Sequence, residues 1–175
     1  MILTRRRVME GGGSLLAVFL VWPAAAATED IVDVAMQGTS GGKHVWFDPI
    51  GLHIKPGQTV RWTNRDPGNS HTATAYHPKI NERPRRIPPN VQPWDSDYLL
   101  PEESFSMKFM RQGVYDYYCV PHEHAGMVGR IVVGKPSTKE PAISADPELT
   151  PLPEAALKGF PSVEQIMAEG IVRRG

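Results

Sequence analysis

The sequence predicts an all-β fold, a sandwich of short strands with a C-terminal extension that contains a short helix. Stretches rich in β-branched and aromatic residues recur at short intervals along the chain. The 175 residues include 17 prolines and 16 glycines, which favour many turns, and no internal repeat is visible. Short strands at this spacing are typical of a β-sandwich. They are expected near residues 30–36, 44–47, 51–55, 59–63, 71–76, 103–109, 114–119 and 128–134.

The N-terminal residues have the pattern of an export signal, predicted over 1–27. Three arginines, 5–7, precede a short apolar stretch, 15–22, and a run of small residues, 24–27. A basic region, a hydrophobic region and a small-residue cleavage site are typical of a signal peptide. The arginines resemble a twin-arginine signal, and a general secretory signal fits as well. We expect cleavage near Ala27 and no stable membrane insertion afterwards, the alternative being an uncleaved anchor.

The composition changes after residue 134, and residues 135–175 are predicted to form a proline-rich tail. Five prolines between residues 135 and 153 indicate an extended linker or an arm along the preceding domain. Residues 154–158 are expected to form one helical turn closed by Gly159. Residues 162–165 have the form of a capping box, which predicts a short helix that ends at Gly170.

The single cysteine of the chain lies in a short motif of potential metal ligands. Cys119 follows the apolar, aromatic run 114–118, and His122 and Met127 come next in the pattern C-x2-H-x4-M. A thiolate, two imidazoles and a weak, long axial thioether form a blue-copper electron-transfer site. The motif supplies three of these four ligands, so a second histidine must come from elsewhere in the chain.

A lone cysteine also fits two other roles. It is often a small, inert, buried residue, but the combined Cys, His and Met spacing disfavours that interpretation. With His122 as its base it would be a cysteine nucleophile. The tight turn disfavours this role, because a thiolate–imidazole pair and an open substrate cleft rarely fit on one such turn.

Residues 119–129 resemble the copper loop of plastocyanins and pseudoazurins. The plastocyanin pattern Cys-x-Pro-His-x-x-Ala-Gly-Met-Val-Gly is matched at Cys119, Pro121, His122, Ala125, Gly126, Met127, Val128 and Gly129. The resemblance extends over about residues 30–134, including the turn and strand at 56–64. It implies a cupredoxin Greek-key β-sandwich, and we expect the copper-binding domain to span residues 28–134.

The resemblance also implies the missing ligand and the roles of all four. The upstream imidazole of the family matches His71, in Asn69-Ser70-His71-Thr72, which makes the expected copper ligands His71, Cys119, His122 and Met127. Both imidazoles would bind through Nδ1, and the edge of His122 would be exposed. Thr72 and backbone amides near the cysteine are candidates for fixing these ligands.

The other histidines are expected to lie away from the metal. His77 would project near the far end of the strand that His71 begins. His124 would be an exposed residue at the rim of the copper loop. His44 and His53 are expected to be ordinary strand or loop residues, with His53 facing away from Leu52.

These observations predict a periplasmic type 1 copper protein that carries one electron between redox partner proteins. The formal charge is zero, so nothing indicates nucleic-acid binding, and we expect a monomer that is not an enzyme. A copper storage or delivery protein is the alternative, although no cluster of methionines is visible. Multi-copper oxidoreductases need more histidines than the six present, and the complete ligand set disfavours a metal-free binding module.

The long connection at residues 78–101 leaves two interpretations open. It contains five prolines besides Pro78, together with Arg83, Arg85 and Arg86. A loop of this length can be an ordinary solvated loop or a functional one. In the second case the arginines would form a docking surface for an acidic redox partner.

Overall fold

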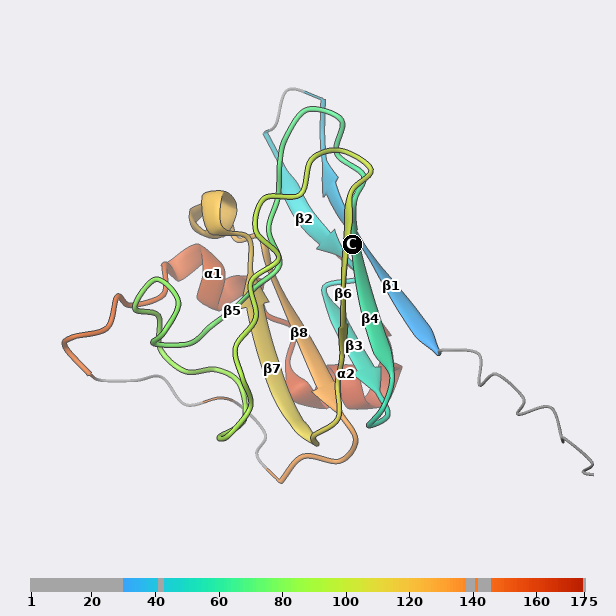
Figure 1. Cartoon of the computed structure of the whole chain (residues 1–175), viewed down its shortest axis with the longest axis vertical. Coiled ribbons are helices and arrows are strands. Elements are labelled where there is room, and N and C mark those ends of the chain that lie inside the picture. Colours follow the sequence, from blue (N-terminus) through green and yellow to red (C-terminus); the bar gives the residue numbers. More distant parts are fainter. Residues whose placement is uncertain (1–29, 41–42, 138–140, 142–145, 175) are drawn as a thin grey trace, which may run out of the picture.

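The computed structural model describes residues 30–40, 43–137, 141 and 146–174. Within them, two β-sheets pack face to face and two short α-helices lie against one sheet (Figure 1). The strand orders are β2-β1-β4-β6 and β5-β7-β8-β3-β9. The elements are β1 (Ile31–Gly38), β2 (Val45–Asp48), β3 (Gly51–Ile54), β4 (Thr59–Asn64), β5 (Thr74–Ala75), β6 (Ser104–Lys108), β7 (Gly113–Tyr118), the 3-10 helix η1 (Val120–Ala125), β8 (Val128–Val133), α1 (Glu154–Gly159), α2 (Val163–Glu169) and β9 (Ile171–Val172).

The pairing of the strands confirms the predicted all-β sandwich. β1 runs parallel to β4, and β3 runs parallel to β8, while the other pairs are antiparallel. Each parallel pair joins strands that are separated in sequence by at least one other element, so the chain crosses between the two sheets more than once. This arrangement brings the ends of β4 and β7 to the same end of the sandwich as η1, the golden coil at the upper left of Figure 1.

The strand expected at 71–76 is reduced to β5, because the residues before it pair with the 78–101 connection. The backbones of His71 and Leu99 exchange hydrogen bonds of 3.2 and 2.8 Å. Ser96 N–H donates to the carbonyl of Ala73 at 3.2 Å. The N–H of Thr72 donates to the sulfur of Cys119 at 3.3 Å, so this amide is not available to a neighbouring strand.

The core between the sheets is built from aromatic and aliphatic side chains. Trp62 is fully buried, and its ring meets that of Tyr117 edge-on at a centroid distance of 5.3 Å. Phe47 packs against the same tyrosine at 4.7 Å. Burial of each such side chain contributes about 1.5–3 kcal/mol to folding. Cys119 and Met127 belong to this same cluster of buried residues, so the candidate metal ligands extend from the core.

The C-terminal tail covers the outer face of the second sheet. Every residue of β7 and β8 is buried, because the first sheet lies on one side and the tail on the other. Ala156 of α1 packs with Tyr118 and Val128. Ile166 of α2 packs with Val132. The tail therefore packs along the sandwich. Of the two predicted arrangements, an extended linker and an arm along the preceding domain, it adopts the second.

The second helix of the tail has the predicted ends, whereas α1 includes Gly159 and is closed by Phe160, and the last strand of the tail was missed. Ser162 accepts a hydrogen bond from Gln165 N–H at 3.0 Å, and Gly170, at φ 77°, closes α2 by donating to Ile166. The tail contains two helices, and β9 then pairs with β3 at the sheet edge. A strand of two residues has no periodicity by which a sequence could reveal it.

Two predictions about chain organisation remain predictions. The export signal expected over 1–27 lies outside the described residues. The predicted division into a copper-binding domain of residues 28–134 and a tail of residues 135–175 also stays a prediction, because the packing of the tail on the sheet does not test it. Among the described residues, no helix combines the length and hydrophobicity needed to cross a lipid bilayer.

Candidate metal centre

Cys119 directly follows β7, and ligand atoms from two other segments meet its sulfur. Sγ of Cys119 lies 3.5 Å from Nδ1 of His71 and 3.4 Å from Nδ1 of His122. The three atoms all lie within 4.8 Å of one another. Cys119 and His71 are fully buried, and His122 is partly exposed. Three of the four predicted ligands therefore converge, and both imidazoles present the same ring nitrogen to the sulfur.

His71 is oriented by a carboxylate that the sequence analysis missed. Asp66 is buried, and its Oδ2 lies 3.1 Å from Nε2 of His71. The same carboxylate accepts hydrogen bonds from Gly68 N–H at 2.9 Å and from Asn69 Nδ2 at 2.7 Å. A histidine that donates Nε2–H to a carboxylate presents Nδ1 to a metal. The aspartate in a turn five residues before the histidine was the available signal.

The electrostatics of the site keep both imidazoles ready to bind a cation. Burial lowers the pKa of His71, against the opposing effect of Asp66, and burial likewise lowers the pKa of His122. Burial alone would raise the pKa of Asp66, but donors from Asn69, Gly68 and His71 outweigh it, and that pKa lies below its ordinary value. The imidazoles are therefore neutral near pH 7, the form that binds metals.

The sulfur of Cys119 is buried and accepts a hydrogen bond from the backbone N–H of Thr72. Burial raises the pKa of the Cys119 thiol to about 12, although hydrogen bonds from Thr72 and His122 oppose the shift. The hydroxyl of Thr72 accepts from Val120 N–H at 2.9 Å and so fixes the segment on which its own amide points to the sulfur. The expectation that Thr72 supports the ligands is consistent with both contacts. A bound cation would have to displace the thiol proton.

Residues 119–127, called the ligand loop below, close on themselves. Cys119 N–H donates to the carbonyl of Met127 at 3.0 Å, and Met127 N–H donates to that of His122 at 3.2 Å. Gly126 adopts the left-handed conformation at φ 78°, where a side chain would be strained. Met127 is fully buried in the same cluster as Cys119, so the loop brings the backbones of the first and fourth predicted ligands together.

Three other histidines, described next, lie outside the group formed by His71, Cys119 and His122. His77 is buried, and its Nδ1 accepts from Lys79 N–H at 3.1 Å. His124 is exposed, as expected. Nε2 of His53 lies 2.8 Å from the carbonyl of Gly134. Among the described residues, the group of metal-binding side chains that the geometry identifies contains His71 and none of these three.

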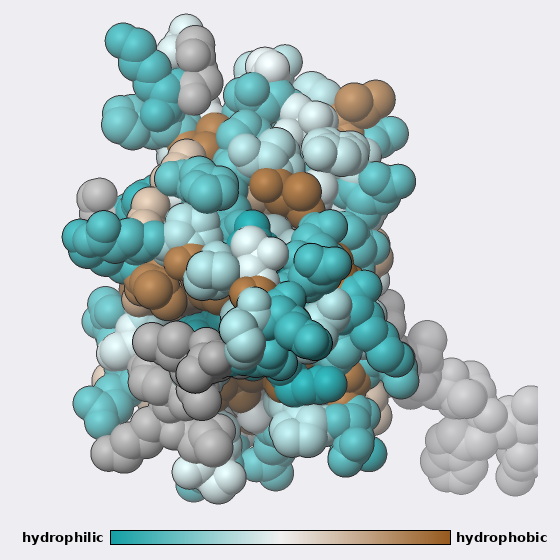
Figure 2. Space-filling view, turned by 90° about the vertical axis from the view of Figure 1, so that its left-hand side faces the viewer, coloured by the Kyte–Doolittle hydropathy of each residue, from teal (hydrophilic) through white to brown (hydrophobic). Residues whose placement is uncertain are grey.

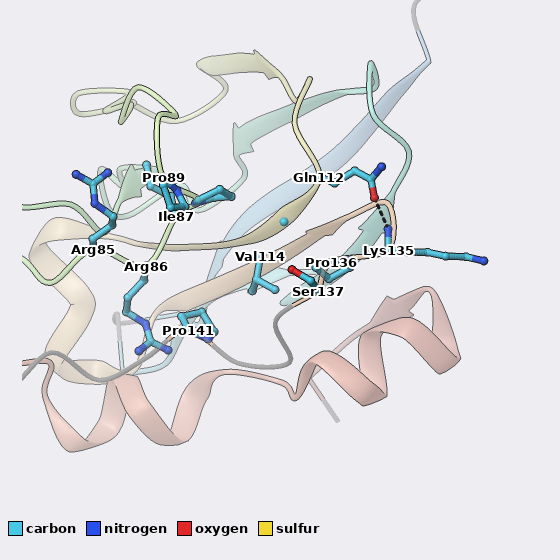
Figure 3. Close-up of a pocket in the computed structure, with 12 residues that line it drawn as sticks. Arg85, Arg86, Ile87, Pro89, Gln112, Val114, Lys135, Pro136, Ser137 and Pro141 are labelled. Carbon is cyan, nitrogen blue, oxygen red and sulfur yellow. Dashed lines mark hydrogen bonds between the residues drawn. The ribbon is translucent and has the colours of Figure 1, made fainter.

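The prediction that three arginines form a docking surface is wrong. Arg86 is 5% exposed and binds the fully buried Asp116 at 2.8 Å, and Arg83 pairs with the buried Glu123. Arg85 is exposed and points away from Arg86 (Figure 3). Buried carboxylates need guanidinium partners, and two of them, Asp116 on β7 and Glu123 in η1, each hold one of these arginines in the fold.

The 78–101 connection is not an ordinary solvated loop either. Its side chains Ile87, Trp94 and Leu99 are buried. The face that it shares with the tail is mostly hydrophilic, with hydrophobic residues in small separate groups (Figure 2). A cavity of about 630 Å3 lies between this connection and the start of β7, whereas Cys119 follows the end of β7 (Figure 3). This cavity is therefore separate from the candidate metal centre.

Comparison with known proteins agrees with the fold and the site. A family model described as copper binding proteins, plastocyanin/azurin family, matches residues 32–134. The chain is 33% identical over 129 residues to a chloroplastic plastocyanin of Tetradesmus obliquus, with 73% of this chain and 81% of that protein covered. It is 29% identical over 121 residues to a pseudoazurin of Methylorubrum extorquens, with 68% and 70% covered. A solved pseudoazurin from Sinorhizobium meliltoi shares the fold at a TM-score of 0.55 and 24% identity, with 79% and 94% covered.

The sandwich and its buried sulfur and nitrogen atoms define a cupredoxin, the class of β-sandwich copper proteins that carry electrons. More specifically, the chain belongs to the plastocyanin/azurin family of copper binding proteins, whose model covers more than half of it. The predicted family and fold are thereby confirmed.

The donor set in the structure fits copper. One thiolate and two neutral imidazoles around a single point suit a metal that alternates between Cu(I), which favours sulfur, and Cu(II), which favours nitrogen. Met127, in the same buried cluster as Cys119, carries a second and weaker sulfur donor. The cofactor of the protein is copper.

Proposed function

We propose that His71, Cys119, His122 and Met127 are the four ligands of one type 1 copper ion in a one-electron carrier. The observation that carries the proposal is the approach of two Nδ1 atoms to one buried sulfur, at 3.5 and 3.4 Å. When bound, copper supplies the Cu(I)/Cu(II) couple. The chain supplies a site in which little has to move when the charge of the ion changes.

Several contacts support this rigidity. Cys119 is attached to the end of β7, a strand buried on both faces. Asp66 holds the ring of His71, and Thr72 holds the segment beside the sulfur. Ligands that are fixed before the metal binds need little reorganisation, which favours fast electron transfer in both directions.

We propose that redox partner proteins dock where His122 reaches the surface. His122 is the one predicted ligand that is partly exposed, whereas His71, Cys119 and Met127 are fully buried. The exposed imidazole edge is the shortest route between the ion and a partner. The four ligands leave the ion no open position for a substrate, which supports a carrier that is not an enzyme.

The predicted export signal supports a periplasmic location for this carrier. Copper storage or delivery is the alternative function, and it requires that the ion exchange readily. A site whose sulfur and one imidazole are fully buried favours retention over exchange. Exchange of bound copper with a chelator separates the two functions, because a delivery protein would release the ion rapidly.

The direct test is an absorption and electron-spin resonance spectrum of the copper-loaded protein. We expect an intense visible band and the narrow copper hyperfine splitting of a type 1 site. Cys119→Ser should abolish the band, since a hydroxyl is a poor substitute for thiolate. A protein that binds copper without the band, or a serine variant that keeps it, would refute the ligand assignment.

A further inference from the structure

The ligand loop contains a buried carboxylate that the copper site itself does not use. Glu123 directly follows His122 and is 1% exposed, although it lies in a short 3-10 helix at the end of the sandwich. The hydroxyl of Tyr76 donates to its Oε1 at 2.8 Å. Arg83 pairs with its Oε2. Both carboxylate oxygens are therefore held by segments outside the ligand loop.

Arg83 extends this contact to the C-terminal tail. Its guanidinium also donates to the carbonyl of Pro151 at 3.0 Å. Beside it, Thr150 N–H donates to the carbonyl of Glu82 at 2.8 Å. The ligand loop, the 78–101 connection and the tail thus meet at one buried carboxylate.

The tail contacts the ligand loop at a second point, Gly126. A Cβ built on this glycine would lie 3.0 Å from the carbonyl oxygen of Ala155 in α1. A Cβ on Gly159 would lie 3.0 Å from the carbonyl oxygen of Gly126. The backbones of α1 and the ligand loop therefore touch without intervening side chains. The first contact point, Glu123, directly follows the ligand His122 in the sequence. The second, Gly126, directly precedes the ligand Met127.

A role in folding stability alone explains this cluster poorly. Taking a carboxylate and a guanidinium out of water is costly, and apolar residues of similar size stabilise such positions as well or better. What a bound carboxylate adds is a fixed geometry, because both of its oxygens have directional partners. Fixed geometry has most value beside a metal ligand, where outer contacts set the positions of the ligands.

We propose that Glu123 is a positioning residue of the metal centre: with Tyr76 and Arg83 it holds the ligand loop against the tail and so fixes His122 and Met127 around copper. This inference rests on the proposed function, since it concerns the same four ligands. It assigns to the tail, which lies beyond the residues that the family model matches, a part in supporting the copper site.

The test compares full-length, copper-loaded variants. Glu123→Ala should weaken copper affinity by about 10–100-fold, the usual effect of losing an outer contact, and change the hyperfine splitting and visible band ratio. Glu123→Gln should keep most of the wild-type copper affinity and most of the wild-type spectrum. Its amide oxygen can accept from Arg83, and its amide N–H can donate to Tyr76. The matched control Glu154→Ala removes a side chain that is 80% exposed on α1 and should leave both unchanged.

The unfolding temperature of each metal-free variant separates positioning from stability. If Glu123→Ala lowers that temperature while the folded protein keeps the wild-type spectrum and affinity, the residue is only structural and the proposal is overturned. If that variant does not fold, Tyr76→Phe decides instead. Tyr76→Phe must then shift the spectrum or weaken the affinity, and wild-type values of both in this variant would overturn the proposal.

The wild-type protein distinguishes this failure from failure of the proposed function. A wild-type protein that lacks the type 1 spectrum contradicts the carrier assignment and the inference with it. A wild-type protein that has the spectrum, with variants that match it, contradicts the inference alone.

Discussion

Nδ1 of His71 lies 3.5 Å from Sγ of Cys119, although 48 positions separate the two residues in the sequence. This approach depends on the N–H of Thr72, which donates to the sulfur instead of to a neighbouring strand. The same segment is held from the other side by the backbone of Leu99. The geometry of the proposed copper site is thus fixed by the route of the backbone as well as by its side chains.

Replacement of Asp66 by asparagine should raise the reduction potential of the copper-loaded protein. Asparagine keeps an oxygen that can accept from Nε2 of His71 but removes a negative charge, which disfavours Cu(II). Voltammetry of the Asp66→Asn variant measures the shift. Asp33→Asn, at a side chain that is 60% exposed, is the control and should change little. A lowered potential in the Asp66 variant would contradict this account.

Met127→Gln should keep copper and lower the reduction potential. The amide oxygen is a harder donor than a thioether and therefore favours Cu(II). The same electrode measurement tests it, with the absorption band as evidence that the other three ligands still bind. An unchanged potential would mean that Met127 is not the axial ligand.

Copper binding should release one proton from Cys119 between about pH 7 and pH 10. The pKa of this thiol is raised to about 12 by burial, so the free protein carries the proton throughout this range. The pKa values of His71 and His122 are lowered, so these imidazoles release no further proton there. Affinity for Cu(I) should therefore rise about tenfold per pH unit. Competition against a chelator at several pH values gives the slope, and a slope near zero would contradict the protonated thiol.

Arg86→Ala should lower the free energy of unfolding by about 1.5–3 kcal/mol, because the buried Asp116 loses the hydrogen bonds of one guanidinium but keeps Arg130 as a partner. Arg85→Ala, at the exposed neighbouring position, should change it by no more than about 0.5 kcal/mol. Urea unfolding of the metal-free proteins measures both. Similar values for the two variants would show that Arg86 does not belong to the interior.

Gly159→Ala should destabilise the protein, although alanine usually stabilises a helix by about 1 kcal/mol relative to glycine. A Cβ at this position would lie 2.8 Å from Cγ2 of Val128 and 3.0 Å from the carbonyl oxygen of Gly126. Such overpacking typically lowers the free energy of unfolding by about 1–3 kcal/mol. Thermal unfolding decides the sign, and a gain in stability would mean that α1 does not press on the ligand loop.

The sequence predicted the features that depend on neighbouring residues. The strands on either side of the ligand loop have local β patterns, and the spacing of Cys119, His122 and Met127 is set within nine consecutive residues. His71 was predicted through the resemblance of its surroundings to a known family. The helix cap at Ser162 is likewise a local signal.

The features that it did not predict depend on burial by distant segments. Glu123 lies between two histidines in a polar stretch, and nothing local indicates that Arg83 and the tail enclose it. The charge of Asp116 draws Arg86 inward from a loop that has the composition of a solvated one. Such pairings follow from the packing of the sheet and the tail, which local patterns do not specify.

Strand β9 has a consequence for how copies of this protein meet. Without it, β3 would present a free row of backbone donors and acceptors at the border of the second sheet, a template for pairing with another molecule. β9 occupies that border with only two residues, and Arg173 and Arg174 follow at once. A border this short, followed by two arginines, offers a second molecule few backbone groups to pair with and so disfavours lasting edge-to-edge association.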